Sequence, residues 1–128
     1  MEHHKRRSGI AHLVSAARYT LDGFKGCFKT EVAFRQEILL GIVHVGVLVL
    51  LPLSVWVRLY MFSIWLLLLS FELINSAIEA AVDLVSPEHN ALAKKAKDCG
   101  SAAVFCVLVI FVGSWAVVVF DLIRKLYG

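Results

Sequence analysis

Four side chains that can bind cations or accept protons recur along one apolar stretch of the chain. Glu72, Asn75, Glu79 and Asp83 follow one another at spacings of three, four and four residues. At about 100° per residue these spacings place all four on one helical face, within about 80° of arc. An acidic side chain inside a membrane span costs about 2.5–3.5 kcal/mol on insertion scales. We therefore expect this row, called the acidic stripe below, to be functional.

Two kinds of site fit the acidic stripe. Mg²⁺ binds carboxylate oxygens together with phosphate oxygens, whereas a row of acids is also typical of a proton or ion relay. A relay needs polar side chains through the whole membrane, and His44 is the one clear candidate in the other half. A lone histidine in a span is more often a hydrogen-bonded structural residue. This favours a site reached from one membrane face.

Two further polar groups are expected at the same membrane face. Lys97 and Asp98 precede the last apolar run, and residues 31–37, EVAFRQE, precede the first. Glu31 and Arg35 stand at i and i+4, a spacing that also fits a simple salt bridge. Together these groups offer carboxylates for a metal, a lysine for phosphate and a base, which phosphoryl transfer requires. The sequence has no P-loop, no G-x-G-x-x-G and no kinase catalytic loop.

The composition indicates a membrane protein. The 128 residues are 59% hydrophobic and 18% charged, with a mean hydropathy of +0.78. Soluble domains carry roughly 45–50% apolar and about 25% charged residues, so a soluble domain and a disordered chain are both excluded. Aromatic residues do not alternate with the basic ones, so we expect no nucleic-acid partner. The three cysteines form no C-x-x-C motif, and we expect free thiols.

Four helices are expected to position these residues in an all-α fold. Residues 10–30 alternate apolar and basic side chains at helical spacing, which predicts an amphipathic helix on the membrane surface. The first nine residues are polar and predicted to be disordered, and 10–128 form one membrane domain. Apolar runs long enough to cross about 30 Å of hydrocarbon predict transmembrane helices at about 34–52, 58–84 and 98–122.

The basic residues predict the orientation of the three spans. Ten of the thirteen Lys and Arg residues lie before residue 38 or between residues 84 and 98. Three spans place these two segments on the same side of the membrane. By the positive-inside rule that side is cytoplasmic. The C-terminus is therefore expected on the opposite side.

Three segments resemble the prokaryotic diacylglycerol kinase family. They are EVAFRQE (31–37), ELINSAIEAAVD (72–83) and AKDCGSAAV (96–104). The resemblance covers nearly the whole chain after residue 8. It implies a homotrimer of three-span subunits in the bacterial inner membrane, with a periplasmic C-terminus and active sites between subunits at the cytoplasmic interface. The implied reaction transfers the γ-phosphate of Mg-ATP to 1,2-diacylglycerol and gives phosphatidic acid, in phospholipid recycling.

The resemblance also implies a role for each matching residue. Glu72 corresponds to the general base, Glu31 and Glu79 to the ligands of Mg²⁺, and Asn75 and Asp83 to supporting residues. The implied nucleotide-binding set is Tyr19, Glu31, Glu79, Glu88, His89, Asn90, Lys97 and Asp98. The implied lipid-binding set is Ala33, Phe34, Arg35, Gln36, Glu37, Glu72, Ser101 and Trp115.

The chain departs from the family pattern at His12, at Leu21 and in the loop that reads EHN. These positions concern nucleotide affinity and lipid fit, and none of them is a carboxylate of the stripe. Two alternatives remain open. One is an undecaprenol kinase of the same fold, and the other is a non-enzymatic trimeric protein that binds ions or lipid.

Overall fold

The fold is entirely helical in the part of the chain that the structure describes. The structure is a computed structural model, and it describes residues 9–86 and 90–128. The helices are α1 (Gly9–Thr30), α2 (Val32–Leu50), α3 (Val55–Val85) and α4 (Ala91–Tyr127). The predicted all-α class is confirmed. The segment predicted to be disordered lies outside the described residues except for Gly9, which begins α1.

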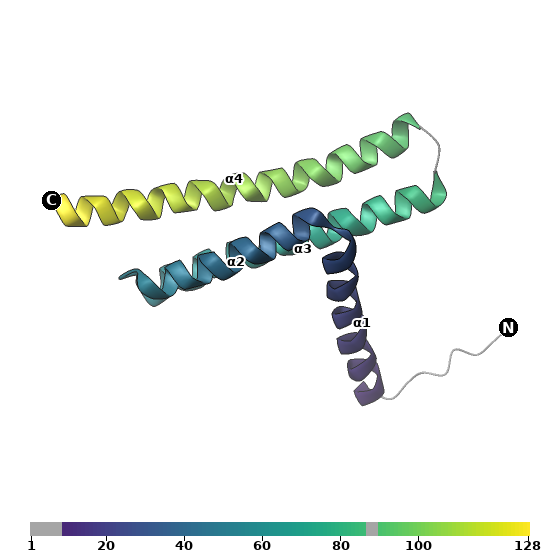
Figure 1. Ribbon diagram of the computed structural model, residues 1–128, viewed down its shortest axis with the longest axis horizontal. Helices are drawn as coiled ribbons and strands as arrows, with labels where there is room; N and C mark the ends of the chain where they lie inside the picture. The colour runs from purple at the N-terminus through teal and green to yellow at the C-terminus, as the bar shows by residue number, and fades with distance from the viewer. Residues whose placement is uncertain (1–8, 87–89) are drawn as a thin grey trace.

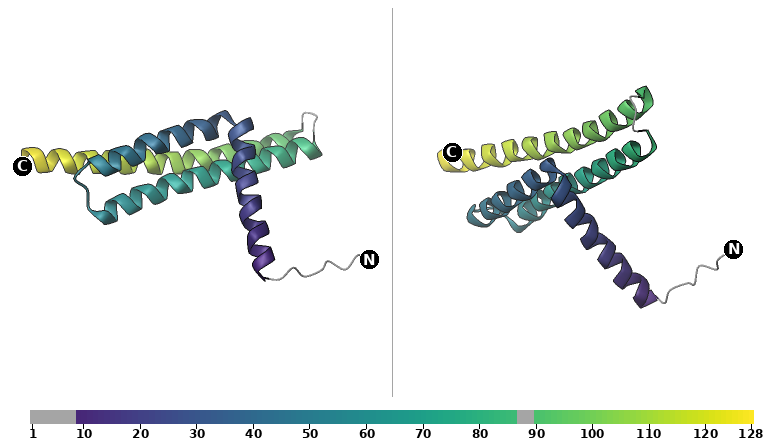
Figure 2. Two further views of the ribbon diagram at one scale, coloured as in Figure 1. Left: turned by 60° about the horizontal axis from the view of Figure 1, so that its bottom comes forward. Right: turned by 45° about the vertical axis from the view of Figure 1, so that its right-hand side comes forward.

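Three of the helices are long and apolar enough to cross a membrane, as the sequence predicts. They are α2, α3 and α4. Figures 1 and 2 show these three running alongside one another, whereas α1 leaves the bundle at a steep angle. None of the residues of α1 is buried in the chain. The three long helices therefore form the body of the molecule, and α1 is an arm attached to it.

The helix boundaries follow from local backbone chemistry. Glu31 is extended, with φ −97° and ψ 120°, and separates α1 from α2. Leu51 is also extended, because a residue before proline, here Pro52, avoids the helical region. The Ser54 side chain accepts a hydrogen bond from the Val57 N–H at 3.4 Å and caps α3. The Asn90 Oδ1 accepts from the Leu92 N–H at 2.8 Å and caps α4.

The helix α4 is longer than the sequence suggests. It begins at Ala91 and ends at Tyr127, whereas the predicted span covers about 98–122. Most of the polar segment before the span is therefore the first two turns of α4. Lys97 and Asp98 consequently stand on a rigid helix.

The helix α3 is the centre of the bundle. It packs against α4 along much of its length and against α2 over a shorter stretch, whereas α2 and α4 meet through long side chains, with His44 against Phe111 and Trp115. The fully buried side chains are Phe34, Met61 and Leu68. Many large apolar side chains on the three long helices are exposed. Such a surface suits hydrocarbon or a further subunit better than water.

Two tryptophans connect helices through their indole N–H groups. The Trp65 Nε1 donates to the Glu37 carbonyl oxygen at 3.0 Å. Gly41 makes room for this contact, because a Cβ there would overlap the Trp65 ring. The Trp115 Nε1 donates to His44 Nδ1 at 3.2 Å. The structural, hydrogen-bonded role expected for His44 is thus confirmed.

Gly41 and Arg35 both lie at contacts between helices. Gly41 allows the Trp65 ring to approach α2 closely, whereas Gly46 faces open space within the chain. The Arg35 guanidinium donates to the carbonyls of Phe28, at 3.0 Å, and Lys29, at 3.2 Å. Arg35 therefore binds the C-terminal end of α1, and in the described part of the chain it forms no salt bridge with Glu31.

Candidate functional site

The acidic stripe runs along α3 from the interior of the bundle to the end of the helix. Glu72 and Asn75 are buried, Glu79 is half-buried and Asp83 is exposed. The spacing of these residues keeps them on one face, as predicted. A ligand held by the whole stripe would extend from the membrane interior toward the polar interface.

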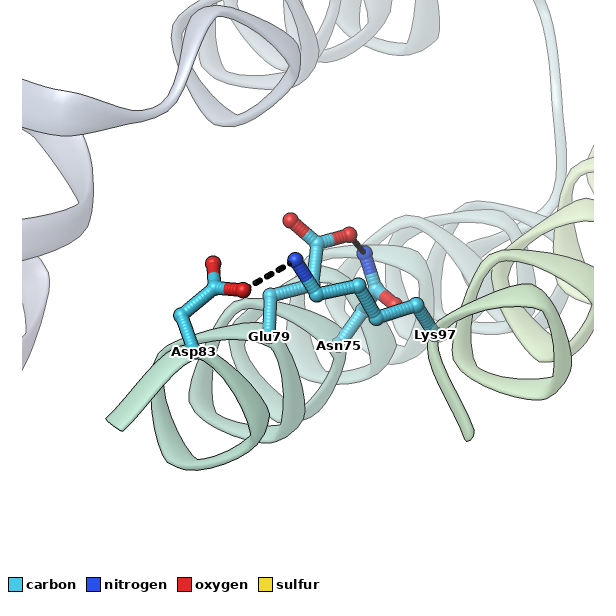
Figure 3. A network of polar contacts seen from close by, with 4 residues as sticks. All are labelled: Asn75, Glu79, Asp83 and Lys97. Atoms are coloured by element: carbon cyan, nitrogen blue, oxygen red, sulfur yellow. Dashed lines mark hydrogen bonds and ion pairs between the residues drawn. The ribbon is translucent and has the colours of Figure 1, made fainter. Parts of the chain in front are cut away.

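The middle of the stripe is fixed by a hydrogen bond between neighbouring turns. The Asn75 Nδ2 donates to the Glu79 Oε1 at 3.0 Å, as Figure 3 shows. Gly100 on α4 faces this pair, because a Cβ at Gly100 would overlap Asn75 Oδ1. The absence of a side chain at Gly100 therefore allows α4 to approach the stripe closely.

The outer end of the stripe is bridged by a lysine from α4. The Lys97 Nζ lies 2.5 Å from Asp83 Oδ1, and Figure 3 shows the lysine extending across α3 to reach it. Asp98 is paired on its own helix, with the Lys94 Nζ at 2.5 Å. Lys97 and Asp98, both implied to contact the nucleotide, thus make ion pairs here. The Lys94–Asp98 pair is exposed, whereas in the other pair Asp83 is exposed and Lys97 is half-buried. Exposed pairs contribute about 1 kcal/mol or less, so a phosphate can displace them.

Two further carboxylates come from the beginning of α2. The Glu31 Oε1 accepts a hydrogen bond from the Thr30 hydroxyl at 2.8 Å. Glu37 is half-buried, and its Oε2 has no hydrogen-bond partner among the described residues. The charge of Glu72 is repelled by those of Glu79 and Glu31 and of Glu37. Residues distant in the sequence are thus brought to one acidic region.

A cation would lower the repulsion in this acidic region. Among the described residues no three His, Cys, Asp or Glu side chains come close enough to hold a metal ion by themselves. Mg²⁺ does not require such a cage, because one or two carboxylates suffice when phosphate oxygens and water complete its coordination. The carboxylates implied as its ligands, Glu31 and Glu79, suit this hard cation.

The predicted nucleotide-binding residues do not all meet within one chain. Tyr19 is exposed on α1, and the described part of α1 does not contact α4, which carries Lys97 and Asp98. The Asn90 side chain caps α4. Glu88 and His89 lie outside the described residues. A single subunit therefore holds parts of this set on separated elements.

The predicted lipid-binding residues fall into three groups. Ala33, Gln36 and Ser101 are exposed, and Arg35 and Glu37 are half-buried at the beginning of α2. Phe34 is fully buried, with the Phe24 ring centroid 6.1 Å from its own, so its side chain offers no surface to a ligand. Trp115 is partly buried beside His44.

Two contacts around the site are not evident from the sequence. One is the approach of Gly100 to Asn75, and the other is the hydrogen bond between Trp115 and His44. A glycine within a helical pattern is a signal for close packing. The partner of such a glycine depends on how the helices cross. Periodicity along one helix cannot predict that crossing.

Comparison with known proteins identifies the family. The family model described as "Prokaryotic diacylglycerol kinase" matches residues 18–119. A protein named diacylglycerol kinase from Pseudomonas aeruginosa is 45% identical over 114 residues, covering 89% of this chain and 93% of the relative. Proteins of the same name from Haemophilus influenzae (36% identical, covering 90% and 98%) and Escherichia coli (33%, covering 89% and 93%) also match. The resemblance seen in the sequence is confirmed, and with it the enzyme class. The chain belongs to the prokaryotic diacylglycerol kinase family.

Proposed function

We propose that the protein transfers the γ-phosphate of ATP, in the presence of Mg²⁺, to the free hydroxyl of 1,2-diacylglycerol. The product is phosphatidic acid, and the role is phospholipid recycling. One observation carries this proposal. Glu72 is buried on α3, and the same face leads outward through Glu79 to a lysine, Lys97. A base for a lipid hydroxyl and a cation for phosphate thus share one path from the membrane interior to its surface.

In the proposed step, Glu72 accepts the proton of the lipid hydroxyl. The hydroxyl oxygen forms a bond to the γ-phosphorus while the bond from that phosphorus to the β-bridging oxygen breaks, and ADP leaves. Because Glu72 is buried, it can receive the hydroxyl of a lipid that arrives laterally from the bilayer. Asn75 holds Glu79 in place through their 3.0 Å hydrogen bond. A positioned base of this kind contributes about 10²–10⁴-fold to the rate.

The negative charge of the nucleotide phosphates is neutralised at the outer part of the stripe in this proposal. Mg²⁺ would supply charge stabilisation at the phosphates when bound, with Glu31 and Glu79 as its protein ligands. Lys97 exchanges Asp83 for a phosphate oxygen of the nucleotide. Tyr19, Asp98 and the 88–90 loop are the remaining nucleotide contacts in this proposal.

A homotrimer with composite active sites accounts for the distribution of these residues. Because α1 does not contact α4 within the described chain, Tyr19 meets Lys97 across a subunit boundary in this proposal. The exposed apolar surface of α2, α3 and α4 supports further burial against other subunits. We place the N-terminus in the cytoplasm and the C-terminus in the periplasm, in the inner membrane, on the basis of the basic residues.

The proposed reaction is tested by following the γ-phosphate. Purified protein in mixed micelles receives ATP radiolabelled at the γ-position, Mg²⁺ and either diacylglycerol or undecaprenol. We expect label in phosphatidic acid, and none when Mg²⁺ is omitted. Label in undecaprenyl phosphate alone would overturn the substrate and retain the chemistry. Label in neither lipid, from folded protein, would overturn the kinase proposal in favour of ion or lipid binding.

A further inference from the structure

A buried histidine connects the three long helices deep within the bundle. The His44 Nε2 lies 3.2 Å from the Met61 carbonyl oxygen on α3, and the His44 Nδ1 lies 3.2 Å from the Trp115 Nε1 on α4. The two rings meet edge to face, with centroids 5.4 Å apart, and the Phe111 ring lies 5.1 Å from the imidazole. His44 is only 3% exposed, so these contacts account for its whole polar surface.

The two hydrogen bonds define the form of His44. An indole N–H is a donor only, so Nδ1 must be the acceptor and carries no proton. In the neutral ring the proton then lies on Nε2, which donates to the Met61 carbonyl. Both nitrogens are satisfied, and Trp115 is bonded to a side chain that is itself fixed to α3. A leucine at this position would leave the Trp115 N–H without its acceptor.

This contact lies well below the acidic stripe. His44 follows Glu37 by seven residues on the same face of α2, or about 10 Å. Met61 and Glu72 are eleven residues apart on α3, or about 17 Å. His44 cannot touch a hydroxyl held at Glu72. Half of the hydrocarbon thickness is about 15 Å, so the contact lies at the depth that acyl chains reach from a lipid head at the stripe.

Trp115 presents part of its ring at that depth. It follows the buried Phe111 by one helical turn on α4 and is itself only partly buried. The same face of α4 carries Gly100, which approaches Asn75 in the stripe. The exposed part of the indole is therefore accessible to apolar ligands at this depth.

We propose that His44 is a positioning residue for recognition of acyl chains, because it holds the Trp115 indole where the far parts of long chains lie. The proposal rests on the proposed function and adds a determinant of substrate choice. His44 acts through Trp115 and has no part in phosphoryl transfer. Recognition of long-chain acceptors depends on His44. Recognition of short-chain acceptors, whose acyl chains end before they reach Trp115, does not.

Four variants separate the hydrogen bond from the rings. His44→Leu removes both hydrogen bonds, and His44→Gln restores an acceptor and a donor. Trp115→Phe keeps an apolar ring and removes the N–H, and the double variant His44→Leu/Trp115→Phe completes a cycle. Each is assayed with dioleoylglycerol and with dioctanoylglycerol at equal mole fraction. The indole N–H resonance of Trp115, assigned by its loss in Trp115→Phe, reports the hydrogen bond without any substrate.

We expect His44→Leu to raise KM for dioleoylglycerol about three- to tenfold, the effect of one lost hydrogen bond. KM for dioctanoylglycerol, kcat and KM for ATP should stay within about twofold of the parent. His44→Gln should restore the parental KM. The double variant should be no worse than the poorer single variant, because both remove the same contact. The indole resonance should shift in His44→Leu and return in His44→Gln.

Three results would overturn the inference. They are an equal change for both acceptors, a fall in kcat without a change in KM, and an indole resonance that does not respond to His44→Leu. A parent that phosphorylates neither diacylglycerol would overturn the proposed function and this inference with it. Failure of the proposed function is thus seen with the parent protein itself. Failure of the inference alone is seen only when the variants are compared with an active parent.

Discussion

At the scale of single residues, two buried oxygen atoms have no hydrogen-bond partner among the described residues. They are Asn75 Oδ1 and Glu37 Oε2. A buried acceptor without a donor costs about 1–3 kcal/mol, so such atoms call for an explanation. Both atoms belong to the acidic region around Glu72. Each is an acceptor and therefore needs a hydrogen-bond donor. The hydroxyl of a lipid acceptor is a donor that fits this requirement.

Glu79→Gln tests the proposed metal ligand. The glutamine carbonyl can still accept the Asn75 hydrogen bond, so the fold should survive, but the negative charge is lost. We expect the Mg²⁺ concentration for half-maximal activity to rise at least about tenfold. Asp121→Asn is the matched control, because this carboxylate pairs with Lys125 at the far end of α4. Identical Mg²⁺ titrations for parent and Glu79→Gln would remove Glu79 from the metal site.

Lys97→Gln tests the proposed phosphate contact. In its ion pair with Asp83 the carboxylate is exposed and the lysine is half-buried, so loss of the pair should lower the thermal midpoint little. We expect KM for ATP to rise at least about tenfold, since one charged hydrogen bond to phosphate is worth about 1.5–3 kcal/mol. The control is Lys95→Gln, on an exposed position of the same helix. An equal effect of both substitutions would point to general surface charge and away from a specific contact.

At the scale of helices, close approach at glycines fixes where the site residues lie. Gly41 admits the Trp65 ring onto α2, and Gly100 admits α4 to Asn75. The bond from Trp65 reaches the carbonyl of Glu37, so the same contact holds the part of α2 that carries an acidic side chain. Helix packing and the geometry of the site are therefore coupled.

Gly41→Ala and Gly46→Ala form a matched pair. A methyl group at Gly41 would collide with the Trp65 ring, whereas one at Gly46 meets nothing within 4 Å in the chain. We expect Gly41→Ala to destabilise the protein by about 1–3 kcal/mol, and Gly46→Ala to be neutral or stabilising by up to about 1 kcal/mol. Denaturation in detergent by circular dichroism measures both. A larger loss for Gly46→Ala would mean that the assembled protein covers this face.

The sequence predicts most of the helical arrangement for physical reasons. Long charge-free runs identify spans, and the spacing of the acidic stripe identifies its common face. The early beginning of α4 at Ala91 is left open by the sequence, because a short polar segment fits a loop as well as the first turns of a helix. The contacts of Trp115 with His44 and of Gly100 with Asn75 are missed because they depend on how helices cross. The sequence thus predicts which residues are candidates for the site. It does not predict the hydrogen bonds and contacts that connect them across helices.

At the scale of the whole molecule, the described chain leaves many large apolar side chains of its long helices exposed. The helix α3 packs against both α2 and α4, whereas most of α1 projects away from the bundle. If all three long helices cross the membrane, the two ends of the chain lie on opposite sides of it. The proposed homotrimer and the proposed orientation can each be tested by a separate experiment.

The orientation is tested with single cysteines in a chain whose own cysteines, Cys27, Cys99 and Cys106, are replaced. These thiols are free in the structure, so their replacement breaks no disulfide. We expect Gly128→Cys to react with an impermeant maleimide in intact cells, and Lys95→Cys to react only after permeabilisation. The reverse pattern would contradict the orientation taken from the basic residues.

Composite active sites are tested by mixing impaired subunits. The assay uses ATP well below the parental KM, where Tyr19→Ala and Lys97→Gln are each impaired alone, and we expect their co-expression to recover part of the parental activity. Recovery follows if Tyr19 of one subunit serves Lys97 of another, because some mixed sites then contain neither substitution. Mixtures of two proteins purified separately in a detergent that prevents exchange serve as the control. Co-expression without recovery, in verified mixed oligomers, would place both residues in the same subunit.

The most direct test of the central claim is the turnover of Glu72→Gln on diacylglycerol. The substitution keeps the shape of this buried side chain and removes its ability to accept a proton. We predict that turnover falls at least about 10²-fold, while helix content, oligomeric mass and ATP binding stay at parental values. Turnover close to that of the parent would contradict the account, because the buried carboxylate of the stripe would then not be the base.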